Sequence, residues 1–105
     1  MAELISHDES NIPKLIQKAF QFHKTGDFEQ AVIYYETVIP KIENKQTKAS
    51  LHGNVGAILI SQGEYQLAKS HLEAAVKEYP ESSQANFNLA VLLSSKLGKH
   101  GLAIR

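Results

Sequence analysis

A short pattern of a glycine, an aromatic residue two positions later and an alanine three positions further on occurs twice in this chain of 105 residues. The first copy starts at Gly26 in "GDFEQA", and the second starts at Gly63 in "GEYQLA", 37 residues downstream. A period of about 20 to 50 residues is typical of folds that stack one supersecondary unit many times. The pattern therefore predicts a repeat architecture, in which each unit buries its apolar face against its neighbours.

Apolar residues recur every three or four positions on both sides of these glycines, which is the spacing of amphipathic helices. The sequence predicts five helices: one after Asn11 that stops at Gly26, one that starts at Asp27, one over about 49–62, one over about 65–78, and one that opens at Ser82–Ser83. Helices of about 14 residues are marginal in isolation, so neighbouring helices must supply most of their stability.

Several residues fix the expected helix ends. Asn11 is a candidate N-cap, and Asp27 followed by Gln30 resembles a capping box. Pro40 lies where the second helix would otherwise continue, and because proline has no amide hydrogen, it should kink or end that helix. Gly98 aligns with the helix-ending Gly63 if one residue is inserted, so a sixth helix would begin just before the end of the sequence.

These features resemble the tetratricopeptide repeat, a helix–turn–helix unit with a period of about 34 residues. The residues that carry the resemblance in the second copy are Val55, Gly56, Leu59, Gly63, Tyr65, Ala68, Leu72, Ala75 and Pro80. The resemblance implies an all-α, right-handed α-solenoid of antiparallel helix pairs, with five helices plus the start of a sixth. The expected organisation is a leader over 1–11, an extended first repeat over 12–48, a second over 49–82 and a truncated third over 83–105.

Composition excludes several functions. Eleven basic and eleven acidic side chains cancel, so we expect no nucleic acid and no membrane partner. There are no cysteines, and the five histidines show no paired spacing with a third ligand, so neither a metal nor a cofactor is predicted. The start of the chain has no signal-peptide pattern, and we expect a cytoplasmic protein that is not an enzyme.

In the family that the chain resembles, the first helix of each unit lines an inner, concave wall. Carried over by register, this implies a peptide-binding groove formed by Gln17, Phe20, Asn54, Ala57, Phe87, Asn88 and Val91. The carboxamides of Gln17, Asn54 and Asn88 would form a line along the wall, where each can donate to and accept from a peptide backbone. This line resembles the asparagine ladder in the repeat region of O-linked N-acetylglucosamine transferases.

The resemblance leaves more than one function open. The leading hypothesis is a protein-interaction module that binds a peptide or a partner helix in the groove. The alternative is an N-terminal targeting arm of a larger transferase, with the catalytic domain elsewhere. Self-association through the apolar fifth helix, which carries Phe87, Leu89, Leu93 and Leu97, is a third possibility. A carboxylate clamp of the kind that holds chaperone C-termini is not expected, because its cations are absent from the matching positions.

Overall fold

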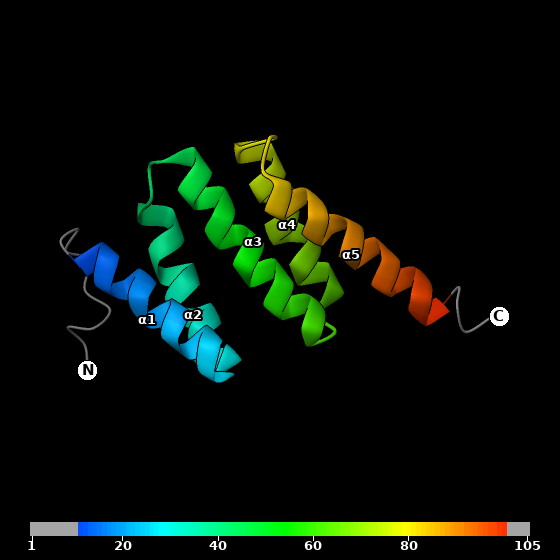
Figure 1. Cartoon of the computed structure of the whole chain (residues 1–105), viewed down its shortest axis with the longest axis horizontal. Helices are drawn as coiled ribbons and strands as arrows, with labels where there is room; N and C mark the ends of the chain where they lie inside the picture. The colour runs from blue at the N-terminus through cyan, green and yellow to red at the C-terminus, as the bar shows by residue number, and fades with distance from the viewer. Residues whose placement is uncertain (1–10, 101–105) are drawn as a thin grey trace. The chain divides into compact units, whose positions relative to one another are not determined.

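The protein is described here by a computed structural model that covers the backbone of residues 11–100 and the side chains of residues 11–94. Within this range the chain forms five α-helices and one short 3-10 helix, and no strand (Figure 1). These elements are α1 (Ile12–Thr25), α2 (Phe28–Val38), η3 (Ile39–Lys41), α3 (Lys45–Ser61), α4 (Tyr65–Glu78) and α5 (Ser83–His100). The prediction of an all-α fold built from helix pairs is confirmed.

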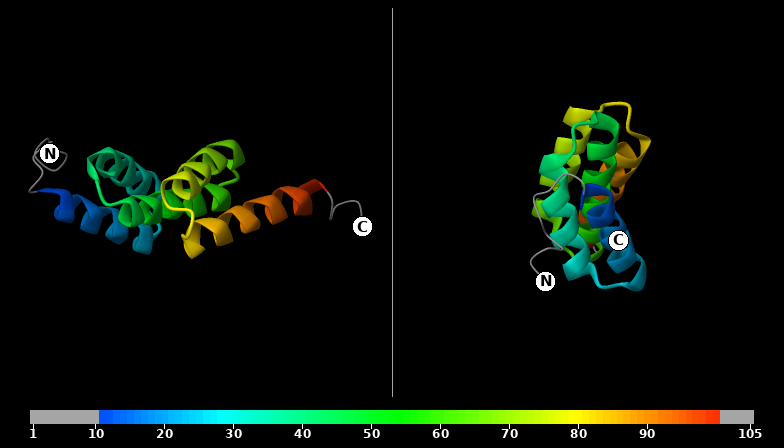
Figure 2. Two further views of the ribbon diagram at one scale, coloured as in Figure 1. Left: turned by 90° about the horizontal axis from the view of Figure 1, so that it is seen from above. Right: turned by 90° about the vertical axis from the view of Figure 1, so that its left-hand side faces the viewer.

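The chain divides into two compact units. Unit 1 is Met1–Glu43 and contains α1, α2 and η3, whereas unit 2 is Asn44–Arg105 and contains α3, α4 and α5. Within each unit, consecutive helices run in opposite directions and pack against each other (Figure 2). The predicted division into a leader and three repeats stays a prediction.

Local backbone chemistry sets the ends of the helices in unit 1. Gly26 ends α1 with a φ of 87°, a left-handed conformation that favours glycine. Asp27 then caps α2, because its carboxylate accepts a hydrogen bond of 3.4 Å from the amide of Gln30, as predicted. Asn11 occupies the predicted N-cap position of α1, but its side chain makes no capping hydrogen bond.

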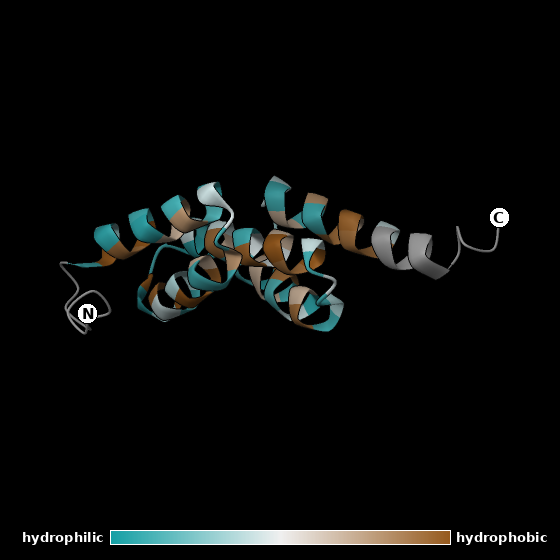
Figure 3. Ribbon diagram, turned by 90° about the horizontal axis from the view of Figure 1, so that it is seen from below, coloured by the Kyte–Doolittle hydropathy of each residue, from teal (hydrophilic) through white to brown (hydrophobic). Residues whose placement is uncertain are grey.

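The core of unit 1 lies between α1 and α2. Leu15 and Ala19 of α1 are buried, and the ribbon of α1 alternates between hydrophobic and hydrophilic segments as an amphipathic helix should (Figure 3). From α2, the phenol oxygen of the buried Tyr35 lies 3.0 Å from Nδ1 of His23, so the core retains one polar contact. Tyr34 is also buried, which the sequence pattern did not indicate.

The segment around Pro40 behaves as predicted. The α-helical part of α2 ends at Val38, and the chain continues as the 3-10 helix η3 before Ile42 becomes extended. Helix α3 then begins at Lys45, four residues earlier than expected from the sequence. Helix α3 begins there because Asn44 caps it, since the side chain of Asn44 accepts a hydrogen bond of 2.8 Å from the amide of Thr47.

Unit 2 is organised by a close crossing of α3 and α4. A Cβ atom added to Gly56 would lie 2.6 Å from the side chain of the fully buried Leu72, so only glycine fits there without a shift. Helix α4 ends at Glu78, shortly before Pro80. Ser82 caps α5 through a hydrogen bond of 3.0 Å from the amide of Ala85, as the sequence predicted.

Within residues 83–94 of α5 the buried residues are Ala85, Asn88 and Leu92, whereas Phe87 and Leu93 are 67% and 59% exposed. The helix also continues through Gly98 to His100, because a glycine inside a helix costs only about 1 kcal/mol and need not end it. The predicted sixth helix falls on residues beyond the described range.

Candidate functional site

Helices α3 and α5 of unit 2 pack against each other and run in the same direction, while α4 runs back between them in the chain (Figure 1). Residues three, four or seven positions apart lie on the same side of a helix. One side of this helix pair, which we call the α3/α5 face, carries Ser50, Asn54 and Ala57 on α3 and Gln84, Phe87 and Val91 on α5. Four of the seven predicted groove residues lie on this face.

A glutamine joins the two helices across the α3/α5 face. The hydroxyl of Ser50 donates to Oε1 of Gln84 at 3.3 Å, and Nε2 of Gln84 donates to Oδ1 of Asn54. Because Ser50 and Asn54 lie one turn apart on α3, a single side chain from α5 spans both of them. Asn54 is only partly exposed, and its carboxamide oxygen is already engaged within unit 2.

The second predicted asparagine lies inside the unit rather than on its surface. Asn88 is 9% exposed, and its Nδ2 donates a hydrogen bond of 3.1 Å to the backbone oxygen of Gly53. The position of Asn88 follows from the way α5 is rotated, since the same side of the helix buries Ala85 and Leu92. Asn88 therefore holds α5 against α3, and its predicted contact with a peptide stays a prediction.

The space above Gly53 is filled by the protein itself. A Cβ atom at this position would lie 3.2 Å from Cδ of Gln84, in a region that the glutamine side chain occupies. The sequence contains a signal for this contact, because the hydrogen-bonded residues Ser50 and Gln84 are 34 residues apart, which is the repeat period. A search for polar pairs at the repeat period would have identified Gln84 as a contact between helices.

The apolar members of the α3/α5 face remain accessible. Ala57 and Val91 are partly exposed, and the ring of Phe87 is 67% exposed. The hydrogen bonds between α3 and α5 join residues about one repeat period apart. Ala57 and Val91 are also 34 positions apart, so they lie at the same height along the two helices. The face thus presents apolar residues, of which Phe87 is the most exposed, beside the exposed polar side chain of Gln84.

The other two predicted groove residues belong to unit 1. Gln17 is exposed on α1. Phe20 is 47% exposed, and the edge of its ring packs against Tyr35 with 6.0 Å between ring centroids. Each therefore presents at least part of its side chain to solvent within its own unit.

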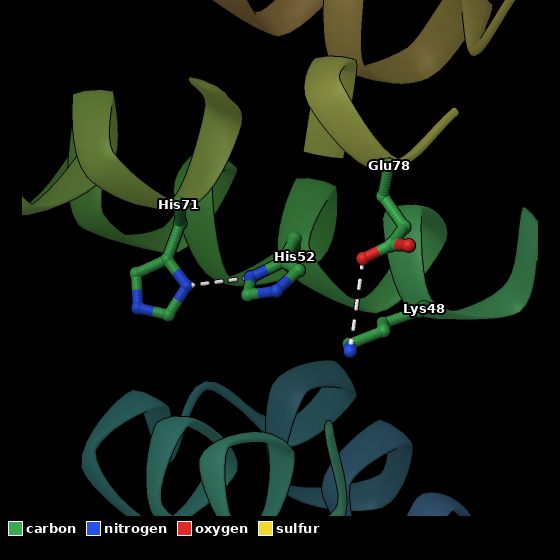
Figure 4. Close-up of polar contacts among 4 residues, drawn as sticks. All are labelled: Lys48, His52, His71 and Glu78. Atoms are coloured by element: carbon green, nitrogen blue, oxygen red, sulfur yellow. Dashed lines mark hydrogen bonds and ion pairs between the residues drawn. The ribbon is translucent and has the colours of Figure 1, made fainter. Parts of the chain in front are cut away.

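Other kinds of site are less well supported among the described residues. No group of three or more histidine, aspartate or glutamate side chains gathers in residues 11–94. No helix in the part of the chain that the structure describes is long and apolar enough to cross a membrane. One ion pair, between Lys48 of α3 and Glu78 of α4 with 3.6 Å between nitrogen and oxygen, bridges the first helix pair of unit 2 (Figure 4).

Comparisons with known proteins agree with this helical arrangement. The family model of the tetratricopeptide repeat matches residues 54–82, which cover the C-terminal part of α3 and all of α4. Residues 54–82 therefore resemble a tetratricopeptide repeat, a unit that is typical of protein-interaction modules and is usually not catalytic. The model does not extend to the first and third predicted copies.

The chain is similar to the rhomboid protease GluP of Bacillus subtilis (strain 168), with 34% identity over 91 residues. The match covers 87% of this chain but only 17% of the relative, so the chain spans a small part of that protein's length. No solved structure gives a significant match.

Proposed function

We propose that the α3/α5 face of unit 2 binds a peptide or a partner helix through an apolar contact centred on Phe87. The observation that supports this most strongly is the exposure of the Phe87 ring, at 67%, beside the partly exposed Val91. Aromatic side chains are enriched at the centres of protein interfaces because they bury a large area at a small cost in conformational entropy. Exposed apolar residues that cluster on one face are typical of binding surfaces.

The polar residues of the face prepare this surface for binding. Gln84 joins Ser50 to Asn54, and Asn88 fixes α5 to the backbone of α3. A surface that is already rigid loses little entropy when a partner is bound. In this proposal Asn54 contacts the partner at the edge of the face, and Asn88 positions α5 from below.

The predicted groove residues of unit 1 enter the proposal as a second contact region. Gln17 and Phe20 are both accessible on α1, and Phe20 offers an aromatic ring to a partner. A ligand that engages both regions would lose affinity on substitution in either unit. The contribution of unit 1 is therefore tested separately, with Phe20→Ala, after a ligand for unit 2 has been found.

The test is a selection of peptides from a displayed random library against the whole 105-residue chain. Enriched peptides are then measured for affinity against three variants of the chain by fluorescence anisotropy. We expect Phe87→Ala to weaken binding by about 10-fold or more, which is typical of an interface residue that costs over 1 kcal/mol when truncated. Val91→Ala should weaken binding less, because valine buries a smaller area.

Leu67 provides a matched control for this experiment. It is 55% exposed, and it lies on α4, away from the α3/α5 face. Leu67→Ala removes a similar amount of exposed apolar surface, so it should leave the affinity unchanged. Equal losses from Leu67→Ala and Phe87→Ala would refute the proposed face, as would enrichment of no peptide at all.

Self-association through α5 is a competing use of the same helix. Leu93 is 59% exposed, and it lies six positions after Phe87, on a different side of α5. Sedimentation at increasing protein concentration distinguishes the two functions. If α5 mediates self-association, Leu93→Asp should shift a dimer to a monomer, whereas peptide binding through Phe87 should survive this substitution.

We further propose that this module works as the partner-binding part of a larger protein. The similarity to 17% of the length of a rhomboid protease supports attachment to a protease. The transferase arm considered from the sequence has no comparable support. An antibody against unit 2 should detect a cellular protein much larger than 11.6 kDa, which is the mass of this chain. A band at 11.6 kDa would contradict the proposal. Protease and glycosyl-transfer assays on the larger protein then separate the two alternatives.

A further inference from the structure

Two histidines from different helices of unit 2 meet at the α3–α4 contact. Nδ1 of His52 on α3 and Nδ1 of His71 on α4 form a hydrogen bond of 2.9 Å, in which one of the two nitrogens carries the proton, and the ring centroids are 5.1 Å apart (Figure 4). Both side chains are partly exposed, so solvent reaches the pair. The residues are 19 positions apart in the sequence, and only the antiparallel packing of α3 and α4 brings them together.

The separation of the two nitrogens matches a metal chelate. Nitrogen–metal bonds to first-row divalent metals are about 2.0–2.1 Å long. With nitrogens 2.9 Å apart, two such bonds enclose an angle of about 90° at the metal. This is the angle between neighbouring ligands in square-planar or octahedral coordination, which Cu²⁺ and Ni²⁺ prefer. A tetrahedral Zn²⁺ ion would require the nitrogens to move apart to about 3.3 Å.

We infer that His52 and His71 form a two-histidine site for a divalent first-row transition metal, with Cu²⁺ bound more tightly than Ni²⁺ or Zn²⁺. Imidazole nitrogen is a favoured ligand for these metals, and their affinity for a given site rises to a maximum at Cu²⁺. No third histidine or carboxylate completes the site among the described residues. In this proposal the proton that the two Nδ1 atoms share moves to Nε2 of its own ring, and water molecules fill the remaining coordination positions.

The local charge does not oppose a cation at this place. Lys48 lies one turn before His52 on α3, and its ammonium group pairs with Glu78 at 3.6 Å. The pair is nearly neutral as a whole, so its effect on a nearby ion is small. A metal bound to both histidines joins α3 to α4, and the two histidines lie close enough for this only when both helices are folded and packed. The metal should therefore stabilise the folded state of unit 2 by mass action.

The test is calorimetric titration of the whole chain with CuCl2 and, separately, with NiCl2 and ZnCl2. The wild-type chain should bind one equivalent of Cu²⁺ most tightly, and EDTA should reverse the binding. His52→Gln and His71→Gln should each weaken Cu²⁺ binding by about 100-fold, because the second ligand of a chelate adds roughly this factor. The chain has no cysteine to compete for the metal.

His7→Gln is the matched control, because it removes one of the five histidines at a sequence position outside α3 and α4. It should bind Cu²⁺ as the wild type does. CuCl2 should raise the midpoint of thermal unfolding of the wild type and of His7→Gln. It should not raise the midpoint of His52→Gln or of His71→Gln. Unchanged Cu²⁺ affinity in His52→Gln and His71→Gln would overturn the inference, as would the absence of any binding by the wild type.

A measurement on the wild type keeps the inference testable if a variant fails to fold. In a two-dimensional NMR spectrum of the histidine rings, substoichiometric Ni²⁺ should broaden the signals of two imidazoles first. Assignment of these signals to His52 and His71 would support the site. Preferential broadening of any other histidine would refute it.

Discussion

The side-chain nitrogen of Asn88 donates a hydrogen bond of 3.1 Å to the backbone oxygen of Gly53, and so ties α5 to α3 within unit 2. Asn88 is buried, whereas Gln84, which makes the neighbouring contact between these helices, is exposed. A buried hydrogen bond is more costly to lose than an exposed one, because water cannot replace the missing partner. The two polar contacts between α3 and α5 should therefore differ in their effect on stability.

Replacing Asn88 with alanine should lower the free energy of unfolding by about 1–3 kcal/mol, because it removes a buried hydrogen bond and leaves unfilled space. Gln84→Ala should lower it by less than about 1 kcal/mol, because water can solvate the groups that it leaves. Urea unfolding followed by circular dichroism measures both changes. Equal losses would show that burial does not distinguish the two contacts.

The close crossing of α3 and α4 predicts that Gly56→Ala destabilises the protein. The added methyl group would meet the side chain of Leu72 at 2.6 Å, and Leu72 is fully buried and cannot move into solvent. Overpacking of this kind costs about 1–3 kcal/mol, which exceeds the gain of about 1 kcal/mol in helix propensity. Thermal unfolding should therefore show a lower midpoint for Gly56→Ala.

Gly53→Ala is the matched control on the same helix. The three atoms nearest its added methyl group all belong to the side chain of Gln84, the closest at 3.2 Å, and this side chain is long and exposed. The gain in helix propensity of about 1 kcal/mol should then make this variant as stable as the wild type or more stable. A destabilisation like that of Gly56→Ala would mean that the contact with Gln84 is more rigid than its exposure indicates.

Features that depend on a few neighbouring residues were predictable from the sequence. The left-handed glycine at Gly26, the caps at Asp27 and Ser82, and the break at Pro40 all follow from local backbone chemistry. The start of α3 at Lys45 was predictable in principle, because Asn44 is a favourable capping residue, but the polar segment around it gave no apolar periodicity to mark a helix.

The orientation of α5 was not predictable in the same way. Apolar residues occur on several sides of this helix, so more than one stripe could have faced the core. Packing against α3 and α4 selected the side with Ala85 and Leu92, and left Phe87 exposed. Asn88 was then buried because it shares that side, and its polar group found a partner in the backbone of α3.

The ion pair between Lys48 and Glu78 should contribute little to stability. The two side chains are 29% and 30% exposed, and their charged atoms are 3.6 Å apart. Pairs at the surface are typically worth about 0–1 kcal/mol and are weakened by salt. Lys48→Gln should therefore change the free energy of unfolding by less than about 1 kcal/mol at low salt, and the difference from wild type should shrink in 1 M NaCl. A larger loss that persists in 1 M NaCl would contradict this reading of the pair.

The first helices of unit 1 offer a direct comparison of two capping positions. The carboxylate of Asp27 accepts a hydrogen bond from the amide of Gln30, whereas Asn11 makes no side-chain bond to α1. Because loss of a working N-cap typically costs about 1 kcal/mol, Asp27→Ala should lower the free energy of unfolding by about that amount. Asn11→Ala should leave it within about 0.5 kcal/mol of the wild type, as for other surface substitutions. Equal losses in the two variants, measured by urea unfolding, would show that Asn11 caps α1 in solution.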